Sequence, residues 1–278
     1  MEKLIIANWK AHPETLAEGR VLYSAELALA EKYASVKTVI CPPVEMVKEL
    51  SEIDSKHLGS QDVFWQPDED NYGVRYVLVG HSDRRYPSSG AGDTNEVINA
   101  KIRVALASKA TPILLVGERN KGDDRELVLS EQLSKSLSSL SPDELGKILI
   151  CYEPVWAISR PAPEIAPAFG KLGQVPVGIS DEFQQKGNLG SGTFYHSDTP
   201  ENILIVATII KQITGAETIL YGGSVNSQNV ADFLQHSEIS GVVVGEASLD
   251  ATEFENILQV VSKWHEIFEW IKNRRLSW

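Results

Sequence analysis

Cysteine is almost absent, because the chain of 278 residues contains only Cys41 and Cys151. Both lie inside apolar runs, so we expect two buried thiols in a reducing compartment rather than a disulfide. The first residues, MEKLIIANWK, turn polar after four apolar positions and do not have the pattern of a secretory signal. These features together predict a cytoplasmic protein.

Long apolar runs and an excess of positive charge are also missing. No apolar run approaches the ~18 residues that suggest a membrane-spanning helix, so we expect no membrane partner. The chain carries 26 basic and 38 acidic residues, a formal charge of −12, which argues against nucleic acid as a partner. An anionic ligand would have to be attracted by local groups, because the field of the whole chain repels it.

Short apolar runs alternate with amphipathic segments along the chain. Most runs contain Val, Ile and Leu without polar alternation, which is typical of parallel strands covered on both faces. We predict strands at 3–7, 38–41, 57–63, 76–79, 112–116, 147–152, 218–221 and 241–244. Helices are predicted at 13–33, 44–51, 94–108, 126–137, 200–214, 227–235 and 252–272. This alternation indicates an α/β fold, and the periodicity leaves open a closed (β/α)8 barrel or a doubly wound sheet.

Two connections break this rhythm. Between the third and fourth predicted strands only residues 64–74 are free, which is too few for the usual crossover helix, so we expect a shortened, nearly bare connection. After the sixth strand, residues 159–198 include six glycines and four prolines in forty positions. A segment of that length and composition is predicted to be a long insertion that is either functional or poorly ordered.

Polar residues stand at the carboxyl ends of several predicted strands, where parallel α/β folds gather their functional groups. They are Asn8, Lys10, His81, Glu153, Gly222-Gly223-Ser224 and Gly245. Each one alone also suits a structural role, such as a helix cap, a surface charge or a tight turn. Together, a carboxylate, an imidazole, an ammonium and backbone N–H groups that favour a phosphate suit proton abstraction next to a carbonyl in a sugar phosphate.

Five segments resemble the signature blocks of the triosephosphate isomerase family, in that family's order and over nearly the whole chain. They are residues 8–10 (NWK), 80–85 (GHSDRR), 152–158 (YEPVWAI), 221–225 (YGGSV) and 244–249 (VGEASL). The resemblance implies a single (β/α)8 barrel domain over residues 1–278. It also implies that the barrel interconverts dihydroxyacetone phosphate and glyceraldehyde 3-phosphate, so that its partner is a small sugar phosphate and it uses no metal or organic cofactor.

The matched positions imply a role for each catalytic candidate. Glu153 would be the base that moves a proton between the two substrate carbons, and His81 would be the neutral electrophile that polarises the carbonyl. Lys10 would hold the anionic substrate, and Asn8 would donate a hydrogen bond nearby. Pro154 would begin the lid that carries a swing of Glu153 towards the substrate and expels water.

The resemblance further implies a phosphate-binding group of backbone N–H donors. Its members would be Gly223, Ser224, Gly245, Glu246 and Ser159. Asp83 stands where the family usually has glutamate, and we expect it to be a partner of Lys10. Glu246 stands where the family typically has glycine. Its carboxylate would repel a phosphate by about 2–3 kcal/mol at ~6 Å if it pointed inward, or it would face solvent and leave the donors undisturbed.

Three regions depart from the family pattern. Most of the insertion 159–198 has no counterpart in the family's short lid, and it is either an appendage on a working lid or a change in how the lid closes. The missing segment between the third and fourth strands is, in the family, a loop that enters the partner subunit, so we expect the usual homodimer not to form. Residues 262–278 extend beyond the family's usual end as a helix that packs on the barrel or covers another surface.

Three functions are compatible with the sequence. The first is a triosephosphate isomerase, which Glu153, His81 and Lys10 support. The second is an aldose–ketose isomerase for another short sugar phosphate, which the altered lid and Glu246 favour. The third is a barrel with reduced or lost turnover, which the missing subunit loop favours.

Overall fold

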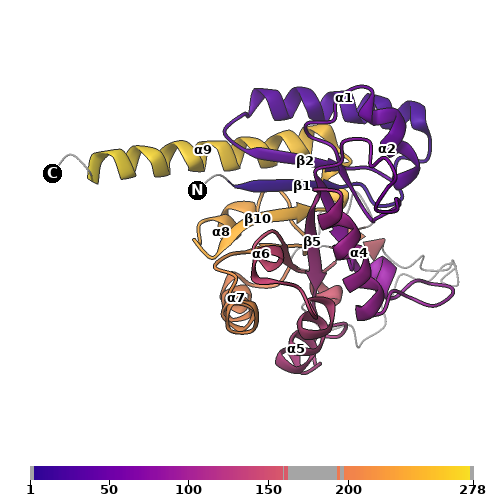
Figure 1. Cartoon of the computed structure of the whole chain (residues 1–278). Helices are drawn as coiled ribbons and strands as arrows, with labels where there is room; N and C mark the ends of the chain where they lie inside the picture. Colours follow the sequence, from indigo (N-terminus) through magenta and orange to yellow (C-terminus); the bar gives the residue numbers. More distant parts are fainter. Residues whose placement is uncertain (1–2, 159, 162–192, 195–196, 276–278) are drawn as a thin grey trace, which may run out of the picture.

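In the described part of the chain, eight parallel strands form the main sheet, and helices pack around it (Figure 1). The computed structural model describes residues 3–158, 160–161, 193–194 and 197–275. The strands lie in one sheet in the order β2-β1-β10-β9-β6-β5-β4-β3. A parallel bridge between Ile40 of β2 and Leu58, next to β3, joins the two ends of this order. The sheet is therefore a nearly closed (β/α)8 barrel, as predicted, and the doubly wound alternative is excluded.

The strands agree with the sequence prediction to within two residues, except for the third. They are β1 Leu4–Asn8, β2 Lys37–Cys41, β3 Gly59–Ser60, β4 Tyr76–Val79, β5 Thr111–Val116, β6 Leu149–Tyr152, β9 Ile219–Tyr221 and β10 Ile239–Val244. β3 keeps two residues of the predicted seven, because the polar residues of Gln61-Asp62 leave the sheet and bond to side chains and carbonyls around them.

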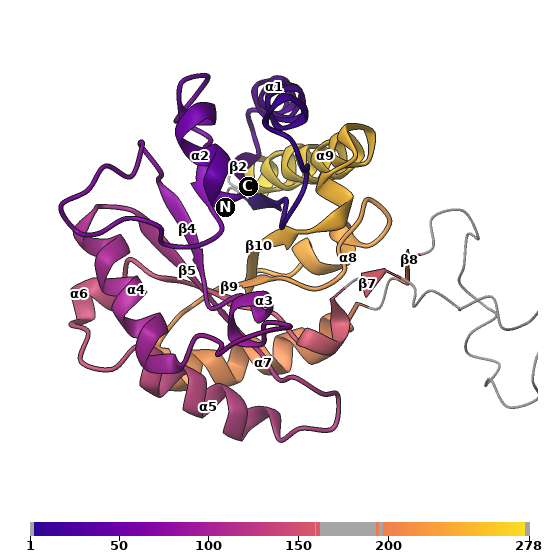
Figure 2. The same ribbon diagram turned by 90° about the vertical axis from the view of Figure 1, so that its right-hand side faces the viewer.

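The helices surround the strands, as the view along the barrel shows (Figure 2). They are α1 Leu16–Lys32, α2 Val44–Ser51, α3 Ser82–Arg85, α4 Asn95–Ala107, α5 Arg125–Ser136, α6 Pro142–Leu145, α7 Pro200–Thr214, α8 Val230–Leu234 and α9 Ala251–Arg275. Several of them begin at a side-chain cap. The hydroxyl of Thr15 and the carboxylate of Glu18 form a capping box at α1, and Thr199 with Pro200 opens α7.

Two buried clusters explain why the strands are apolar without alternation. Leu4 and Ile6 of β1 belong to a cluster made almost entirely of alternate strand residues, which fills the barrel interior. Ile5 and Ala7 belong to the larger cluster between the strands and the helices. Cys41 and Cys151 are free buried thiols of the interior cluster, as expected.

The strand register brings the carboxyl ends of the strands to one level. Ala7 of β1 pairs with Val244, and Val116 of β5 pairs with Tyr152. Tyr152 in turn pairs with Tyr221 of β9. Residues that follow these strands therefore meet at the same mouth of the barrel, which is where the sequence placed the candidate site.

The connection between β3 and β4 contains no helix and folds back onto the body, which confirms the predicted bare crossover. Trp65 is buried, and its indole Nε1 donates a 2.8 Å hydrogen bond to Oγ of Ser108, the residue that follows α4. The ring of Phe64 stacks on that of Tyr72 within the same connection. This segment therefore covers its own barrel instead of projecting from it.

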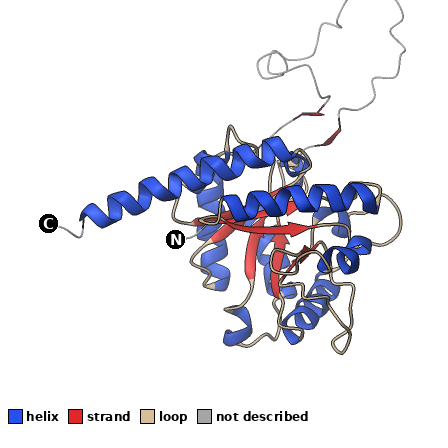
Figure 3. Ribbon diagram, turned by 90° about the horizontal axis from the view of Figure 1, so that it is seen from above, coloured by secondary structure: helices blue, strands red, loops and turns tan. Residues whose placement is uncertain are grey.

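Two other regions lie at the periphery. Of the insertion, residues 160–161 and 193–194 form a short antiparallel pair, β7 and β8, that stands away from the barrel (Figures 2 and 3). Helix α9 packs Phe254, Ile257 and Leu258 on the barrel, and its last turns run past the body (Figures 1 and 3). No helix in the described part of the chain is long and apolar enough to cross a membrane. The cytoplasmic location stays a prediction.

Candidate active site

Glu153 and His81 face each other at the mouth of the barrel. Glu153 follows β6, and its Oε1 lies 2.9 Å from Nε2 of His81, which follows β4. The other carboxylate oxygen, Oε2, accepts a 3.0 Å hydrogen bond from the backbone N–H of Ser82. Both side chains are buried, so this contact is little screened by water. Ser82 was not among the residues expected at the site, although it belongs to the segment GHSDRR.

The protonation of His81 is set by its neighbours on both sides. Its Nδ1 accepts a hydrogen bond from the backbone N–H of Asp83, so the proton of the neutral ring sits on Nε2 and is donated to Glu153. Burial lowers the pKa of His81, but the carboxylate of Glu153 and its hydrogen bond outweigh burial, so that the pKa lies above its ordinary value. The opposing effect of Lys10 is smaller. The raised pKa therefore depends on Glu153 staying where it is.

Lys10 occupies a backbone conformation that is uncommon for a residue with a side chain. Its φ is 54°, in the left-handed region. The N–H of Lys10 donates to Oδ1 of Asn8, and the amide Nε2 of Gln61 donates a 2.8 Å hydrogen bond to its carbonyl oxygen. Gln61 also donates to the carbonyl of Cys41 and so ties the turn to β2. These contacts hold the backbone of Lys10 in this conformation at the mouth of the barrel.

The turns after β9 and β10 bring backbone close to the site. A Cβ on Gly223 would lie 2.0 Å from the hydroxyl oxygen of Tyr221, so only glycine fits there. A Cβ on Gly245 would lie 3.4 Å from Cε of Lys10, which places this glycine beside the lysine side chain. After these turns, α8 starts only at Val230, and β10 is followed by the 3-10 turn Glu246–Ser248. Any N–H groups offered to an anion here would therefore come from the turns themselves.

The N–H of Ser224 is engaged in this structure. It donates a 2.9 Å hydrogen bond to the carbonyl of Ala157, and the Ser224 hydroxyl donates to the same oxygen. Ala157 belongs to the 3-10 turn Val155–Ala157 that follows Glu153. The Ser224 N–H and the position of the segment after Glu153 are therefore linked, because this N–H becomes open to another acceptor only if the turn moves.

One pocket gathers most of the predicted residues. Its empty volume is about 370 Å³, which includes the open solvent at its mouth. Among its lining residues are Asn8, Lys10, His81, Glu153, Gly222, Gly223, Ser224, Gly245 and Glu246. Glu246 is exposed at the rim and also lines the pocket. Ser159 lies outside the described residues.

Asp83 is placed differently from the expectation. Its carboxylate lies 3.5 Å from Nδ1 of His81 and its side chain is 70% exposed. Among the described ion pairs none joins Asp83 to Lys10. The side chain of Asp83 therefore acts on the imidazole, where it adds to the raised pKa of His81, and not on the ammonium.

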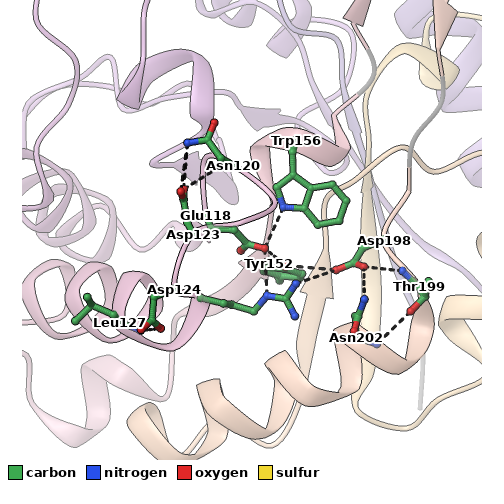
Figure 4. A network of polar contacts seen from close by, with 12 residues as sticks. Glu118, Asn120, Asp123, Asp124, Leu127, Tyr152, Trp156, Asp198, Thr199 and Asn202 are labelled. Atoms are coloured by element: carbon green, nitrogen blue, oxygen red, sulfur yellow. Dashed lines mark hydrogen bonds and ion pairs between the residues drawn. The ribbon is translucent and has the colours of Figure 1, made fainter. Parts of the chain in front are cut away.

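A polar cluster surrounds Tyr152, the last residue of β6, and was not predicted from the sequence (Figure 4). Oε1 of Glu118 accepts hydrogen bonds from the Tyr152 hydroxyl at 2.8 Å, from Trp156 Nε1 at 3.0 Å and from Arg125 Nε at 3.1 Å. Oδ2 of Asp198 lies 3.4 Å from the same Tyr152 hydroxyl. We name Glu118, Arg125, Tyr152, Trp156 and Asp198 the hinge cluster, because Trp156 lies shortly before the insertion 159–198 and Asp198 is the last residue of it.

The fold and site define a class of protein: a (β/α)8 barrel with an acid–base pair, a lysine and two glycine turns at the carboxyl ends of its strands. A sequence model described as "Triosephosphate isomerase" matches residues 3–164 and 189–261. Triosephosphate isomerase of Dictyoglomus turgidum is 33% identical over 280 aligned positions, which cover 92% of this chain and 98% of that protein. Triosephosphate isomerase of Aquifex aeolicus is 32% identical, with 93% and 99% covered. The chain belongs to the triosephosphate isomerase family and is therefore an isomerase.

A solved structure supports the fold. The crystal structure of triosephosphate isomerase from Bartonella henselae superimposes with a TM-score of 0.64 at 22% identity, covering 94% of this chain and 99% of that one. At this identity the likeness concerns the barrel alone.

Proposed function

We propose that the protein interconverts dihydroxyacetone phosphate and glyceraldehyde 3-phosphate by moving one proton through an enediolate. The observation that carries this proposal is the contact of 2.9 Å between Glu153 and His81 in a pocket that Lys10, Gly223 and Gly245 also line. A base, a hydrogen-bond donor and an ammonium around one small cavity are the groups that such a reaction needs.

Glu153 serves as the base after it leaves its resting contacts. In the structure its carboxylate is held by His81 and the Ser82 N–H, so it must rotate to reach a substrate carbon. It then removes the proton next to the carbonyl and returns it to the neighbouring carbon. Tyr152, the neighbour of Glu153 in the chain, belongs to the hinge cluster. This rotation is therefore coupled to a movement of the turn at Ala157 that breaks its hydrogen bond with Ser224.

His81 donates its Nε2 proton towards the substrate carbonyl once Glu153 has moved. The loss of the adjacent carboxylate removes the main influence that raises the pKa of His81. Burial and the Asp83 N–H at Nδ1 then both favour the neutral imidazole. A neutral donor suits this step because it stabilises the enediolate oxygen without first delivering a proton.

Lys10 neutralises charge on the phosphate and on the enediolate. The positive charge matters here because the chain as a whole carries −12 and repels an anion at long range. Backbone N–H groups around Gly223 and Gly245 complete the phosphate site. They bind the phosphate through their dipoles and add no charged group that would have to lose its hydration shell.

Turnover of glyceraldehyde 3-phosphate, followed in a coupled assay on the purified chain, tests the proposal. Glu153→Gln keeps the size of the side chain but cannot accept the proton, so kcat should fall by about 10²–10⁴-fold. Glu126→Gln, at an exposed position of α5, is the matched control and should leave kcat unchanged. An unchanged rate in Glu153→Gln would remove Glu153 from the mechanism.

A further inference from the structure

A second, larger cavity adjoins the candidate active site. Its empty volume is about 710 Å³, again with the open mouth included, against about 370 Å³ for the first pocket. Both cavities are lined by Asn8, Lys10 and His81. The remaining walls of the second cavity include Val44 and Glu45.

The two cavities divide the mouth of the barrel between them. The first lies over the ends of β6, β9 and β10, where the glycine turns are, and the second lies over the ends of β2, β3 and β4. β1 with Lys10 and the imidazole of His81 stand at the boundary. The β3–β4 connection contributes Gln61 to the walls of the second cavity, and Trp65 of the same connection is anchored to Ser108 at the end of α4.

The order of groups across the mouth fixes the direction of a bound substrate. The phosphate is expected at Gly223 and Gly245, and the reacting carbons lie between Glu153 and His81. The carbon farthest from the phosphate therefore points past His81 and Lys10 into the second cavity. A substituent on that carbon has room, whereas a carbon inserted between the carbonyl and the phosphate would push the phosphate off its turns.

One class of sugar phosphate carries its extra carbons at the required end. In an open-chain 2-ketose 1-phosphate, the phosphate, the first carbon and the carbonyl repeat the structure of dihydroxyacetone phosphate. The rest of the sugar is attached to the carbon on the far side of the carbonyl as a hydroxylated tail.

The walls of the second cavity suit such a tail. Glu45 and Asp83 offer carboxylate oxygens to hydroxyl donors, and the Arg84 guanidinium offers N–H groups to hydroxyl oxygens. Together with Lys10, the two carboxylates and the guanidinium give walls of zero net charge, so that a neutral polyol is preferred to a second phosphate. Gln61 is fixed by its bonds to the carbonyls of Lys10 and Cys41, which makes the floor of the cavity preformed.

We propose that the second cavity is a tail subsite that allows the active site to bind open-chain 2-ketose 1-phosphates. This inference rests on the proposed function, because it takes the phosphate position from it. The tail subsite extends the binding range of the site beyond trioses.

A ring-blocked probe tests the subsite. A 5-deoxy-2-ketopentose 1-phosphate has no hydroxyl that can close a five-membered ring, so its tail stays extended. Its inhibition constant against triose phosphate turnover and its Kd by calorimetry are measured on the full chain. Val44→Trp places a large ring in the second cavity, and Val21→Trp, at a 73% exposed position of α1, is the matched control.

The subsite predicts a selective loss. In Val44→Trp the Kd of the probe should rise by about tenfold or more, while the KM for triose phosphate stays within about twofold of wild type. Val21→Trp should change neither quantity. Glu45→Gln, which removes a charged wall without adding bulk, should weaken the probe by about threefold and serves if Val44→Trp does not fold.

Three outcomes would overturn the proposal. In the first, the probe does not bind the wild-type chain. In the second, the probe binds Val44→Trp as tightly as wild type. In the third, Val44→Trp weakens the binding of the probe and of triose phosphate by the same factor. A Val44→Trp variant whose mass falls from two chains to one would assign the cavity to a second copy and would also overturn it. A wild-type chain that binds the probe but does not turn over trioses would refute the proposed function alone.

Discussion

Glu26 is a buried carboxyl group directly beneath the turn that carries Lys10. Its Oε1 accepts a 3.0 Å hydrogen bond from Nε1 of Trp9, the residue between Asn8 and Lys10. Its Oε2 is buried and is bonded to no group in the described part of the chain. Burial raises the pKa of Glu26 well above the ordinary value of 4.5, and the bond from Trp9 offsets only part of this. Folding therefore favours the neutral form of the Glu26 carboxyl group.

The pH dependence of stability tests this state. A carboxyl whose pKa is raised by folding contributes stability fully below its unfolded pKa of 4.5, and this contribution is lost as the pH rises through the folded pKa. Glu26→Gln removes the titration. The free energy of unfolding of Glu26→Gln minus that of wild type should therefore rise by up to about 1.4 kcal/mol per pH unit above pH 4.5. Urea unfolding at several pH values measures this difference.

Glu31→Gln, at an exposed position of the same helix, is the control and should show no such slope. A difference between Glu26→Gln and wild type that stays constant from pH 5 to pH 8 would mean that Glu26 is ionised in the fold, contrary to this account.

Asp198 is the last residue of the insertion 159–198 and a member of the hinge cluster. Its Oδ1 accepts hydrogen bonds from the Thr199 N–H at 2.8 Å and from the Asn202 amide at 2.9 Å. Its Oδ2 lies 3.8 Å from the guanidinium of Arg125. Asp198→Ala removes the buried acceptor of these two part-buried donors and should cost about 1–3 kcal/mol in urea unfolding. Asp68→Ala, on the exposed β3–β4 connection, should stay within about 0.5 kcal/mol, and an equally small effect of Asp198→Ala would contradict the role of the cluster.

At the scale of elements, the approach of β5 to β6 positions Glu153. A Cβ added to Gly117, directly after β5, would lie 2.3 Å from the carbonyl oxygen of Glu153. The obstacle is backbone, so Gly117→Ala must displace the end of β6. A displacement of about 1 Å at a catalytic group can cost on the order of 10²-fold, so kcat should fall by about tenfold to a hundredfold.

Gly122→Ala is the matched control, since a Cβ there meets no atom within 4 Å. Its kcat should equal that of wild type, and circular dichroism should show both variants folded. A Gly117→Ala variant with wild-type kcat would show that the end of β6 tolerates the shift and that Glu153 is not positioned by this contact.

The same elements show what the sequence could and could not predict. Continuous apolar runs predicted the parallel strands because both faces of the sheet are buried, and polar residues at strand ends predicted Glu153, His81 and Lys10. The rule applied to strand ends would also have found Glu118, which stands two residues after β5. Ser82 was beyond reach because it acts through its backbone N–H, and the partner of Asp83 depends on a side-chain direction that no pattern contains.

At the scale of the whole molecule, we expect the short β3–β4 connection to decide the assembly. Phe64 and Tyr72 stack within this connection and Trp65 bonds to Ser108, so we expect it not to reach towards another subunit. The turn of Lys10 receives its support from Gln61 within the same chain. We therefore expect the barrel to hold its catalytic lysine in place without a partner.

A single chain should be the active species. Light scattering in dilute solution should give a mass near 30.6 kDa. The measurement is made at low and at high salt, because a charge of −12 could keep weak dimers apart at low salt only, and salt screens that repulsion. Turnover per chain should also stay constant over a hundredfold dilution, since an active site completed by a partner would lose activity as the partner dissociates. A mass of two chains at both salt concentrations, with turnover that falls on dilution, would show that Gln61 does not suffice and that a second copy completes the turn of Lys10.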